Sequence, residues 1–295
     1  MKILVTGADG QLGRKLRDIF NDEPIYTVLF VGHGEMDITD TDSVERTVSE
    51  FDPDVVVNCA AYTNVEKAEA VDYALANAVN AEGPRHLAEA CLRHDCKLIH
   101  VSTDYVFSGD RNVPYSTDET SKPINVYGQT KRIGERFIED SGCRYIIIRT
   151  SWLYSEYGKN FMKTMDGLIG SRETADVVID QIGSPTYAGD LASFIDYIIF
   201  SGDYMTKNGL FHFSDRGTAT WYDFACAVKE LKGEEGAKTS IRPVPSTCFI
   251  QKAERPHYSV MDCSKTEAVF GYEIPYWRDS LKKCWQKHVF LKNRN

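Results

Sequence analysis

Short apolar runs recur along the first half of the chain, between longer segments whose apolar positions follow helical spacing. The run Asp54–Cys59 is rich in β-branched residues, as in a strand buried on both faces of a parallel sheet. The predicted strands are Lys2–Thr6, Ile25–Val31, Asp54–Cys59, Lys97–Val101 and Arg144–Thr150. The first predicted helix follows the first strand and ends near Phe20, and the others cover Thr41–Glu50, 64–78, 80–95 and Tyr127–Asp140. We expect Asp40 or Thr41 to cap the second helix. This alternation predicts an α/β fold with a doubly wound parallel sheet and right-handed crossovers.

The pattern loosens after Thr150, where strands and helices no longer alternate regularly. Helices are predicted over Phe161–Ile169, near Asp190–Phe200, over Trp221–Lys232 and near Trp277–Val289, strands at Val177–Asp180 and Gly209–Phe213, a turn at Gly183–Thr186, and loops over Ser151–Lys159 and up to Pro256. We therefore expect residues 1–150 to form the sheet domain. Residues 151–295 are expected to form mainly a smaller C-terminal lobe, with some segments returning to the first domain.

A glycine-rich loop, Gly7–Gly13, joins the first predicted strand to the first predicted helix. Glycines at positions 7, 10 and 13 permit a tight turn, close approach of the backbone to a pyrophosphate, and close packing of helix on strand. The helix N-terminus then directs free N–H groups at the phosphates. This arrangement predicts a Rossmann-like domain that binds a dinucleotide through Gly7, Gly10, Gln11, Leu12 and Gly13.

The second predicted strand, Ile25–Val31, bears on the choice between NAD and NADP. An acidic residue near the end of this strand binds the ribose 2′-hydroxyl of NAD, whereas a cation accommodates the 2′-phosphate of NADP. The strand leads into Gly32–Glu35, and no Lys or Arg occurs between Arg17 and Arg46. This pattern leans toward NADH and leaves NADPH open. We also assign to the cofactor site Asp37, Ile38, Ala60, Ala61 and Tyr62.

Tyr127 and Lys131 lie four residues apart on a predicted helix, and therefore on one face of it. An isolated tyrosine has a pKa of about 10, and a cation beside it stabilises the phenolate. Thr103, at the end of a predicted strand, can hydrogen-bond the same substrate oxygen. Together the three side chains suit a substrate with a carbonyl or an alcohol. A half-buried tyrosine beside a lysine that reaches solvent is the simpler structural alternative.

The composition narrows the class of protein. A net charge of −9 and a pI near 5.3 argue against a general binder of nucleic acid or anionic membranes. No run of about 18 apolar residues occurs and no signal-peptide pattern opens the chain, so we expect a soluble cytoplasmic protein. The eight cysteines are scattered. Cys91, His94 and Cys96 lack a fourth ligand nearby, so no metal site is expected there.

Motifs along nearly the whole chain resemble those of the extended short-chain dehydrogenase/reductase superfamily and, within it, the reductases of dTDP-linked 4-keto-6-deoxy sugars. The motifs are Gly7–Gly13, Asn58–Tyr62, Ser102–Phe107, Asn125–Lys131, Arg149–Trp152, Gln181–Thr186 and Arg255–Pro256. The resemblance implies an oxidoreductase that uses NADPH or NADH. Its implied reaction is reduction of the C4 keto group of dTDP-4-dehydro-β-L-rhamnose to dTDP-L-rhamnose, within polysaccharide biosynthesis.

The resemblance also implies a role for each matching residue. Thr103 would polarise the C4 carbonyl, Tyr127 would give its proton to that oxygen, and Lys131 would lower the tyrosine pKa and hold the nicotinamide ribose. The substrate-binding residues would be Thr103, Asp104, Tyr105, Trp152 and Arg255. Of these, Trp152 would contact the sugar and Arg255 the nucleotide. A core aromatic at position 152 and a solvated surface cation at position 255 are the structural alternatives.

Two positions qualify this resemblance. Related 4,6-dehydratases follow the threonine with an Asp-Glu pair that eliminates water, whereas here Asp104 precedes Tyr105. This difference favours plain reduction. Relatives with a metal-bridged dimer carry an acidic residue in the first helix, where this chain has Lys15. Lys15 argues against Mg²⁺ at such an interface, and a homodimer formed through other surfaces stays open.

Two other functions stay open at this stage. The first is reduction of a different nucleotide-linked 4-keto sugar, or reduction that gives the other stereoisomer. The second is a non-catalytic regulatory subunit with the same fold. The presence of Thr103, Tyr127 and Lys131 together argues against the regulatory subunit.

Overall fold

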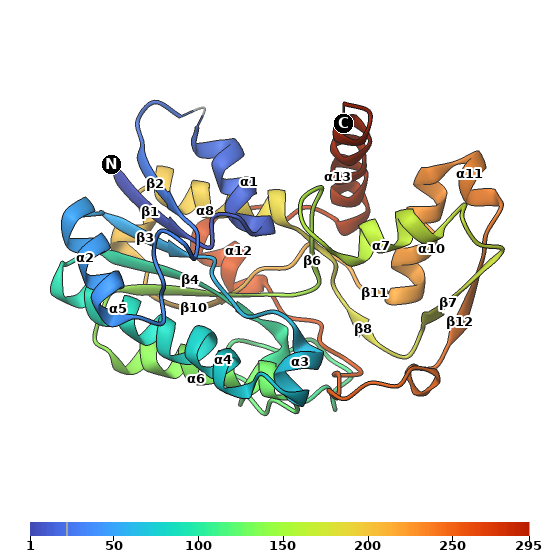
Figure 1. The fold of residues 1–295 in the computed structure, drawn as a ribbon, viewed down its shortest axis with the longest axis horizontal. Coiled ribbons are helices and arrows are strands. Elements are labelled where there is room, and N and C mark those ends of the chain that lie inside the picture. Colours follow the sequence, from blue (N-terminus) through green and yellow to red (C-terminus); the bar gives the residue numbers. More distant parts are fainter. Residues whose placement is uncertain (22, 295) are drawn as a thin grey trace.

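A central parallel sheet organises the computed structural model, which describes residues 1–21 and 23–294 (Figure 1). Six strands form this sheet in the order β10-β5-β4-β3-β1-β2. They are β1 (Lys2–Thr6), β2 (Thr27–Val31), β3 (Val55–Asn58), β4 (Lys97–Thr103), β5 (Tyr145–Thr150) and β10 (Gly209–His212). The predicted α/β fold with a parallel sheet is confirmed. Residues 22 and 295, which belong to the two expected domains, lie outside the described residues.

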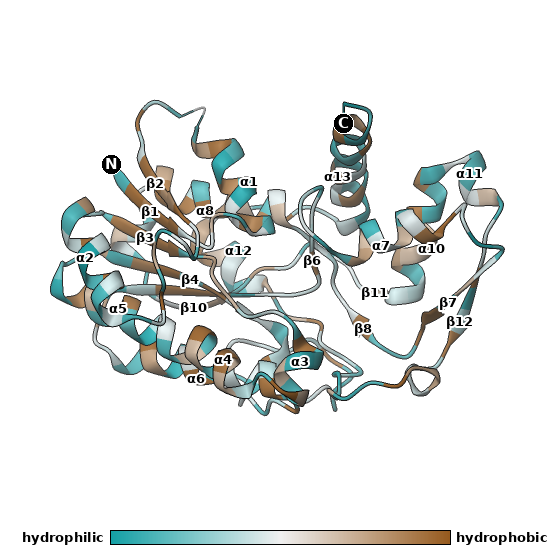
Figure 2. Cartoon of the chain, viewed as in Figure 1, coloured by the Kyte–Doolittle hydropathy of each residue, from teal (hydrophilic) through white to brown (hydrophobic). Residues whose placement is uncertain are grey.

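Helices cover both faces of the sheet. Along β1, Ile3 and Val5 pack in one hydrophobic cluster and Leu4 packs in a second, because successive side chains of a strand point to opposite faces. Figure 2 shows the resulting brown strands between helices with hydrophilic outer faces. One face is covered by α1 (Gln11–Phe20), α8 (Ala188–Phe200) and α12 (Ser264–Phe270), and the other by α2 (Thr41–Phe51), α5 (Gly83–Arg93) and α6 (Val126–Asp140). Asp40 caps α2 through its side chain, as one of the two predicted caps.

The segment between β3 and α5 differs from the prediction of two continuous helices. It contains α3 (Val65–Ala70), α4 (Tyr73–Asn77) and a π-helical turn, η1 (Ala78–Glu82). Asn80 in this turn is fully buried and hydrogen-bonds both the N–H of Tyr62, at 2.8 Å, and its carbonyl, at 3.0 Å. The irregular helix therefore holds the loop after β3, which carries the predicted cofactor residues Ala60–Tyr62.

The second half of the chain has its own hydrophobic core. Its helices are α7 (Phe161–Leu168), α9 (Asp203–Thr206), α10 (Trp221–Lys232), α11 (Glu234–Ala237) and α13 (Trp277–Lys292), and α7, α10 and α13 contribute to this core. Three two-stranded sheets accompany them: β7 (Thr174–Val178) with β12 (Ser240–Val244), β6 (Leu153–Tyr154) with β9 (Thr186–Tyr187), and β8 (Ile182–Gly183) with β11 (Ala219–Thr220). Two 3₁₀ turns, η2 (Asp104–Val106) and η3 (Ser246–Cys248), complete the elements.

Some boundaries in this half were predicted wrongly. The strand expected at Val177–Asp180 is β7, which begins and ends earlier, at Thr174 and Val178. The expected proline-rich loop contains strand β12. Among the described residues this strand pairs with β7 alone and so has a free edge, which tolerates Pro243. β10 pairs in parallel with β5 at the edge of the central sheet, although it belongs to the second half.

None of the helices within residues 1–21 and 23–294 has both the length and the apolar character that crossing a bilayer would require. The same described residues contain no group of three or more His, Cys, Asp or Glu side chains arranged to hold a metal ion.

A buried ion pair joins α1 to the second half of the chain. The Lys15 ammonium lies 2.8 Å from Glu156 and 2.8 Å from Asp18. The side chains of Lys15 and Glu156 are 3% and 2% exposed, and the Tyr187 hydroxyl also lies 3.2 Å from Glu156. Lys15 is therefore a buried cation with carboxylate partners, at the position where relatives with a metal-bridged dimer carry an acidic residue.

We predict that Glu156→Gln lowers the free energy of unfolding by about 3 kcal/mol, because it leaves the buried Lys15 charge poorly compensated. Urea unfolding monitored by circular dichroism measures this change. Asp18→Asn is the matched control: the Asp18 side chain is 42% exposed, so its removal should cost less than about 1 kcal/mol. Equal losses in the two variants would contradict this account of the pair.

Candidate active site

Two adjoining cavities lie where the central strands end. The larger, of about 580 Å³, extends from the glycine-rich loop across the ends of β4 and β5 to Trp221. The smaller, of about 440 Å³, lies between the glycine-rich loop, the end of β2 and the loop after β3. Asp9, Gly10, Cys59 and Ala61 line both. The two cavities therefore form one continuous site at the C-terminal edge of the sheet, where ligands of open α/β sheets bind.

The glycine-rich loop has the form that a dinucleotide requires. Gly7 has φ +63°, and a Cβ there would meet the backbone N of Ala60 at 2.6 Å. Gly10 precedes α1 without any side-chain cap, so the first N–H groups of the helix remain free to bind phosphate. Of the predicted cofactor residues, Gly7 lines the smaller cavity and Gly10, Gln11 and Leu12 the larger. Gly13 lines neither and packs against Gly7 and Ala8.

The smaller cavity suits an adenosine. Its walls include the apolar side chains of Met36, Leu75 and Val79, which offer a surface for a base. The predicted residues Asp37, Ile38, Ala60, Ala61 and Tyr62 all line it. Partial burial would raise the pKa of Asp37, but hydrogen bonds from the N–H and hydroxyl of Thr39, at 2.9 and 2.8 Å, lower it, so this carboxylate is ionised at neutral pH.

Helix α6 is fixed at its first turn, which carries Tyr127. The Asn125 side chain caps the helix by accepting from the N–H of Gly128 at 2.8 Å, and donates to the carbonyl of Glu254 at 2.8 Å. Gly128 lies so close to the turn after β4 that a Cβ at this position would overlap the carbonyl of Tyr105. The tyrosine is therefore held directly beside the residues that end β4.

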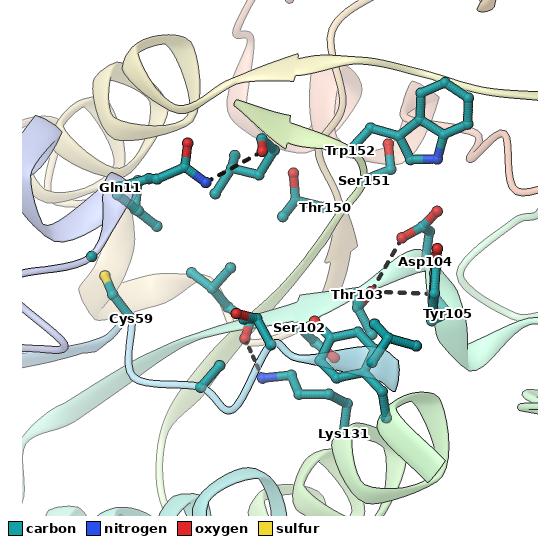
Figure 3. A pocket seen from close by; sticks show the side chains of 18 of the residues that line it. Gln11, Cys59, Ser102, Thr103, Asp104, Tyr105, Lys131, Thr150, Ser151 and Trp152 are labelled. Carbon is teal, nitrogen blue, oxygen red and sulfur yellow. Dashed lines mark hydrogen bonds between the residues drawn. The ribbon is translucent and has the colours of Figure 1, made fainter. Parts of the chain in front are cut away.

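Thr103, Tyr127 and Lys131 all line the larger cavity, and Figure 3 shows Thr103 and Lys131 among the residues around it. The Thr103 hydroxyl donates to Asp104 at 3.1 Å, accepts from the N–H of Tyr105 at 3.2 Å, and is a hydrogen-bond partner of Tyr127. Burial raises the pKa of Tyr127 to about 12, which the hydrogen bond with Thr103 opposes. Tyr127 is therefore a phenol at neutral pH, able to donate a proton.

Lys131 reaches from α6 to the end of β4. Its side-chain nitrogen donates to the carbonyl of Val101 at 2.7 Å and lies 3.3 Å from Nε2 of His100. Burial lowers the pKa of Lys131 to about 8, and the Glu135 carboxylate opposes this shift. Because burial raises the pKa of Tyr127 in this structure, the lowering of that pKa by Lys131 stays a prediction.

Asp104 and Tyr105 form the wall next to Tyr127. Asp104 is 2% exposed, and burial raises the pKa of its carboxyl to about 7, although hydrogen bonds with Ser259 and Thr103 oppose the shift. The Tyr105 ring packs edge-on against Tyr127 with centroids 5.7 Å apart. Burial also raises the pKa of Tyr105, which the nearby Arg255 guanidinium opposes.

Trp152 adopts a strained backbone and an aromatic stack. Its φ of +46° lies in the left-handed region, which is costly for a bulky residue. The indole stacks on Trp221 with centroids 3.6 Å apart and planes at 4°, and a Cβ at Gly183 would meet this indole at 2.5 Å, so the glycine leaves room for it. Both tryptophans line the larger cavity, so together they form a flat apolar wall there.

Arg255, like Gly13, is a predicted site residue that lines neither of the two cavities. Its guanidinium lies 2.7 Å from Glu66 of α3 and 2.6 Å from the Gln251 side chain. The guanidinium nevertheless opposes the rise in the pKa of Tyr105, which lines the larger cavity. A contact between Arg255 and a nucleotide stays a prediction.

Sequence reasoning missed several residues that line the larger cavity. They include Asp9, Thr63, Ser102, Ser151, Lys159 and Trp221. Asp9 lies inside the glycine-rich loop, and Ser102 and Ser151 adjoin recognised motifs, so their positions were available signals. Lys159 and Trp221 come from the second half of the chain and carried no such local signal.

The parallel sheet, the glycine-rich loop and the cluster of Thr103, Tyr127 and Lys131 define a Rossmann-fold oxidoreductase of the extended short-chain dehydrogenase/reductase class. The chain belongs to the RmlD substrate binding domain family, whose model matches residues 1–290.

Individual relatives match over nearly the full length. The dTDP-4-dehydrorhamnose reductase of Aggregatibacter actinomycetemcomitans is 40% identical over 290 residues, which cover 95% of this chain and 97% of the relative. A probable dTDP-4,6-dihydroxy-2-methyloxan-3-one 4-ketoreductase of Streptomyces antibioticus is 39% identical, with 97% and 95% covered. The crystal structure of dTDP-4-dehydrorhamnose reductase from Bacillus anthracis in complex with NADP is 37% identical, with a TM-score of 0.91 and 97% and 99% covered.

We predict that Asp104→Asn stabilises the protein at alkaline pH. The folded state holds the Asp104 proton more tightly than the unfolded state, so the free energy of unfolding falls as pH rises from about 4 toward 7. The asparagine variant has no such loss. Its free energy of unfolding relative to that of the wild type should therefore be higher at pH 8 than at pH 4.5 by about 2–4 kcal/mol. Urea unfolding of both proteins at the two pH values measures it.

Asp118→Asn, at an exposed position, is the control for the loss of one carboxyl group, and it is measured at the same two pH values. A pH-independent difference between wild type and Asp104→Asn would show that the Asp104 carboxyl does not retain its proton in the fold.

Proposed function

We propose that this chain reduces the C4 keto group of dTDP-4-dehydro-β-L-rhamnose to dTDP-L-rhamnose, with NADH or NADPH as reductant. The observation that carries this proposal is the meeting of Thr103, Tyr127 and Lys131 in one cavity with the glycine-rich loop. The names of relatives that match the chain at nearly full length support the choice of a dTDP-linked sugar.

In the proposed reaction, the bound nicotinamide supplies the hydride that adds to C4 of the sugar. Thr103 and Tyr127 donate hydrogen bonds to the keto oxygen. Tyr127 then transfers its proton to this oxygen as negative charge develops there, which leaves a phenolate. The Lys131 ammonium stabilises that phenolate and binds the ribose hydroxyls of the cofactor. The raised pKa of Tyr127 keeps its proton in place until substrate is bound.

The remaining predicted residues are assigned to substrate binding. Trp152, supported by its stack on Trp221, offers the apolar wall on which a 6-deoxy sugar can lie. Asp104 and Tyr105 line the cavity beside Tyr127, and Arg255 is assigned to the nucleotide. Tyr105, rather than a glutamate, supports reduction without elimination of water.

We further propose the division of labour expected from sequence: residues 1–150 bind the cofactor and residues 151–295 mainly bind substrate. The pairing of β10 with β5 and the packing of α8 on α1 support the return of some segments to the first domain. The cytoplasmic location expected from sequence stays a prediction, and a homodimer stays open.

The charge of the smaller cavity supports a preference for NADH. Asp9 and Asp37 line it, and its described lining residues include no Lys or Arg. His33 also lines this cavity, where it lies 3.7 Å from Asp37 with its side chain 85% exposed. A 2′-phosphate would meet carboxylates here, whereas a 2′-hydroxyl can donate to them.

A second candidate is reduction of another dTDP-linked keto sugar. The Streptomyces antibioticus relative, a probable 4-ketoreductase of a different dTDP-linked compound, is as similar to this chain as the named rhamnose reductases are. A non-catalytic regulatory subunit is disfavoured because the partly buried Tyr127 and the buried Lys131 line a cavity of about 580 Å³.

We predict that the purified protein oxidises NADH when it is given dTDP-4-dehydro-β-L-rhamnose, with dTDP-L-rhamnose as product. Absorbance at the reduced-nicotinamide band follows the reaction, and the product is identified by mass spectrometry and NMR. We expect kcat/KM to be about tenfold higher with NADH than with NADPH, a difference of about 1.4 kcal/mol. Cofactor binding without oxidation of either cofactor would shift the function to the other keto sugar or to the regulatory subunit.

We predict that Tyr127→Phe loses turnover by about a hundredfold or more and keeps cofactor affinity, because only the proton donor is removed. Steady-state kinetics and fluorescence titration with NADH measure the two properties. Tyr154→Phe is the matched control, since Tyr154 is buried and lies outside both cavities. Near-normal turnover by Tyr127→Phe would contradict the assigned role.

A further inference from the structure

A buried row of polar side chains crosses the sheet beneath Lys131. Thr6 of β1, Asn58 of β3 and His100 of β4 occupy directly paired positions in neighbouring strands. The Thr6 hydroxyl donates to the Asn58 oxygen at 2.6 Å, the Asn58 amide nitrogen lies 2.9 Å from His100 Nδ1, and His100 Nε2 lies 3.3 Å from Lys131 Nζ. All four side chains are at most 1% exposed. Figure 3 shows Lys131 reaching toward this strand end.

The backbone sets the orientation of Asn58. The N–H of Ala60, which can only donate, lies 3.1 Å from the Asn58 Oδ1 atom. The Thr6 hydroxyl also donates to this oxygen. The oxygen of the amide is therefore fixed on that side, and the Asn58 NH₂ group must face His100.

This orientation selects the tautomer of His100. Because Asn58 donates to Nδ1, a neutral imidazole must carry its single proton on Nε2, the nitrogen that faces Lys131. Burial and the Lys131 charge both lower the pKa of His100, so the ring is neutral. A donor N–H is thus directed at the lysine nitrogen, which can accept it only as a neutral amine.

We propose that His100 is a positioning residue for Lys131: held by Asn58, its Nε2–H group fixes the lysine nitrogen against the Val101 carbonyl and disfavours the ammonium form. The lysine then exchanges its proton near neutral pH. The consequence for turnover rests on the reduction proposed above, whereas the effect on the lysine itself does not.

Every charged or titratable group around Lys131 enters this balance. Glu135, one turn further along α6, favours the ammonium, and so would a thiolate at Cys59 after β3. Burial raises the pKa of Cys59 to about 12, so this thiol is neutral. Burial alone would raise the pKa of Glu135, but Arg149, Ser102 and Arg132 lower it, so Glu135 is a carboxylate. Tyr127, one turn before Lys131, is neutral below about pH 12. His100 is therefore the neighbour that works with burial against the ammonium.

The test measures protonation of Lys131 without substrate. Pulses of acetic anhydride label neutral amines, and the fraction labelled at Lys131 between pH 6 and 10 is read by peptide mass spectrometry. We expect a midpoint near pH 8 in the wild type. His100→Gln can turn its amide oxygen toward the lysine and accept from the ammonium, so its midpoint should rise by about one pH unit.

A second variant guards against misfolding. His100→Asn keeps an oxygen that can accept from Asn58 but is too short to reach Lys131, so its midpoint should rise as well. Ile99→Val, at a buried position next to His100 and outside the polar row, is the control for lost packing and should leave the midpoint unchanged. A midpoint unchanged from wild type in both His100 variants would overturn the proposal.

Kinetics then separate this proposal from the proposed function. If the chain is the reductase, the pH at which kcat falls on the alkaline side should rise in His100→Gln together with the labelling midpoint. A shifted labelling midpoint in a protein that reduces no keto sugar would contradict the reductase function and support the role of His100. If the chain reduces the keto sugar, and His100→Gln shows the same alkaline fall in kcat and the same labelling midpoint as the wild type, only the role of His100 is contradicted.

Discussion

The contact between helix α6 and the turn after β4 is the constraint on which the site depends. Only a glycine at position 128 lets the helix approach the Tyr105 carbonyl, and the Asn125 cap fixes where the helix begins. A methyl group at position 128 would push the helix outward, and Tyr127 would then move away from Thr103 and Lys131 away from the Val101 carbonyl. The catalytic geometry proposed here is therefore a consequence of backbone packing, which side-chain chemistry then uses.

Buried charge holds the same helix further along its length. Glu135 accepts from Arg149 of β5 at 2.8 and 2.7 Å and from the Ser102 hydroxyl of β4 at 2.5 Å. Removing such groups from water is costly, and well-packed apolar residues would often be as stable. The ion pair with Arg149 and the hydrogen bond with Ser102 join α6 to the ends of β5 and β4. The next residues of these two strands, Thr150 and Thr103, line the cavity. Lys15 and Glu156 make a comparable connection between α1 and the second half.

The parts that sequence predicted well are those specified by local spacing. The strand, glycine loop and helix at Lys2–Phe20 and the spacing of Tyr127 and Lys131 are written in neighbouring residues, so the parallel sheet and the residues that meet in the larger cavity followed from them. Trp221, Lys159 and His100 gain their positions from contacts between distant segments, which no short window contains. The strand Ser240–Val244 was hidden by Pro243, because the tolerance of a proline depends on which edge of a strand is left unpaired. The ion pair of Arg255 with Glu66 likewise joins segments that are far apart in the sequence.

The electrostatics of the cavity arise from burial acting on groups of opposite type. Burial disfavours charge on both the phenol and the amine, so it raises the pKa of Tyr127 to about 12 and lowers that of Lys131 to about 8. Both shifts favour the uncharged forms, whereas the proposed proton transfer from Tyr127 would create a phenolate beside the Lys131 ammonium. The charged pair is therefore most stabilised when both charges exist together, at the moment of reduction, because each then has its counter-ion within a cavity of low polarity. A site built in this way keeps its proton donor intact in the resting state and concentrates its stabilisation on the transition state.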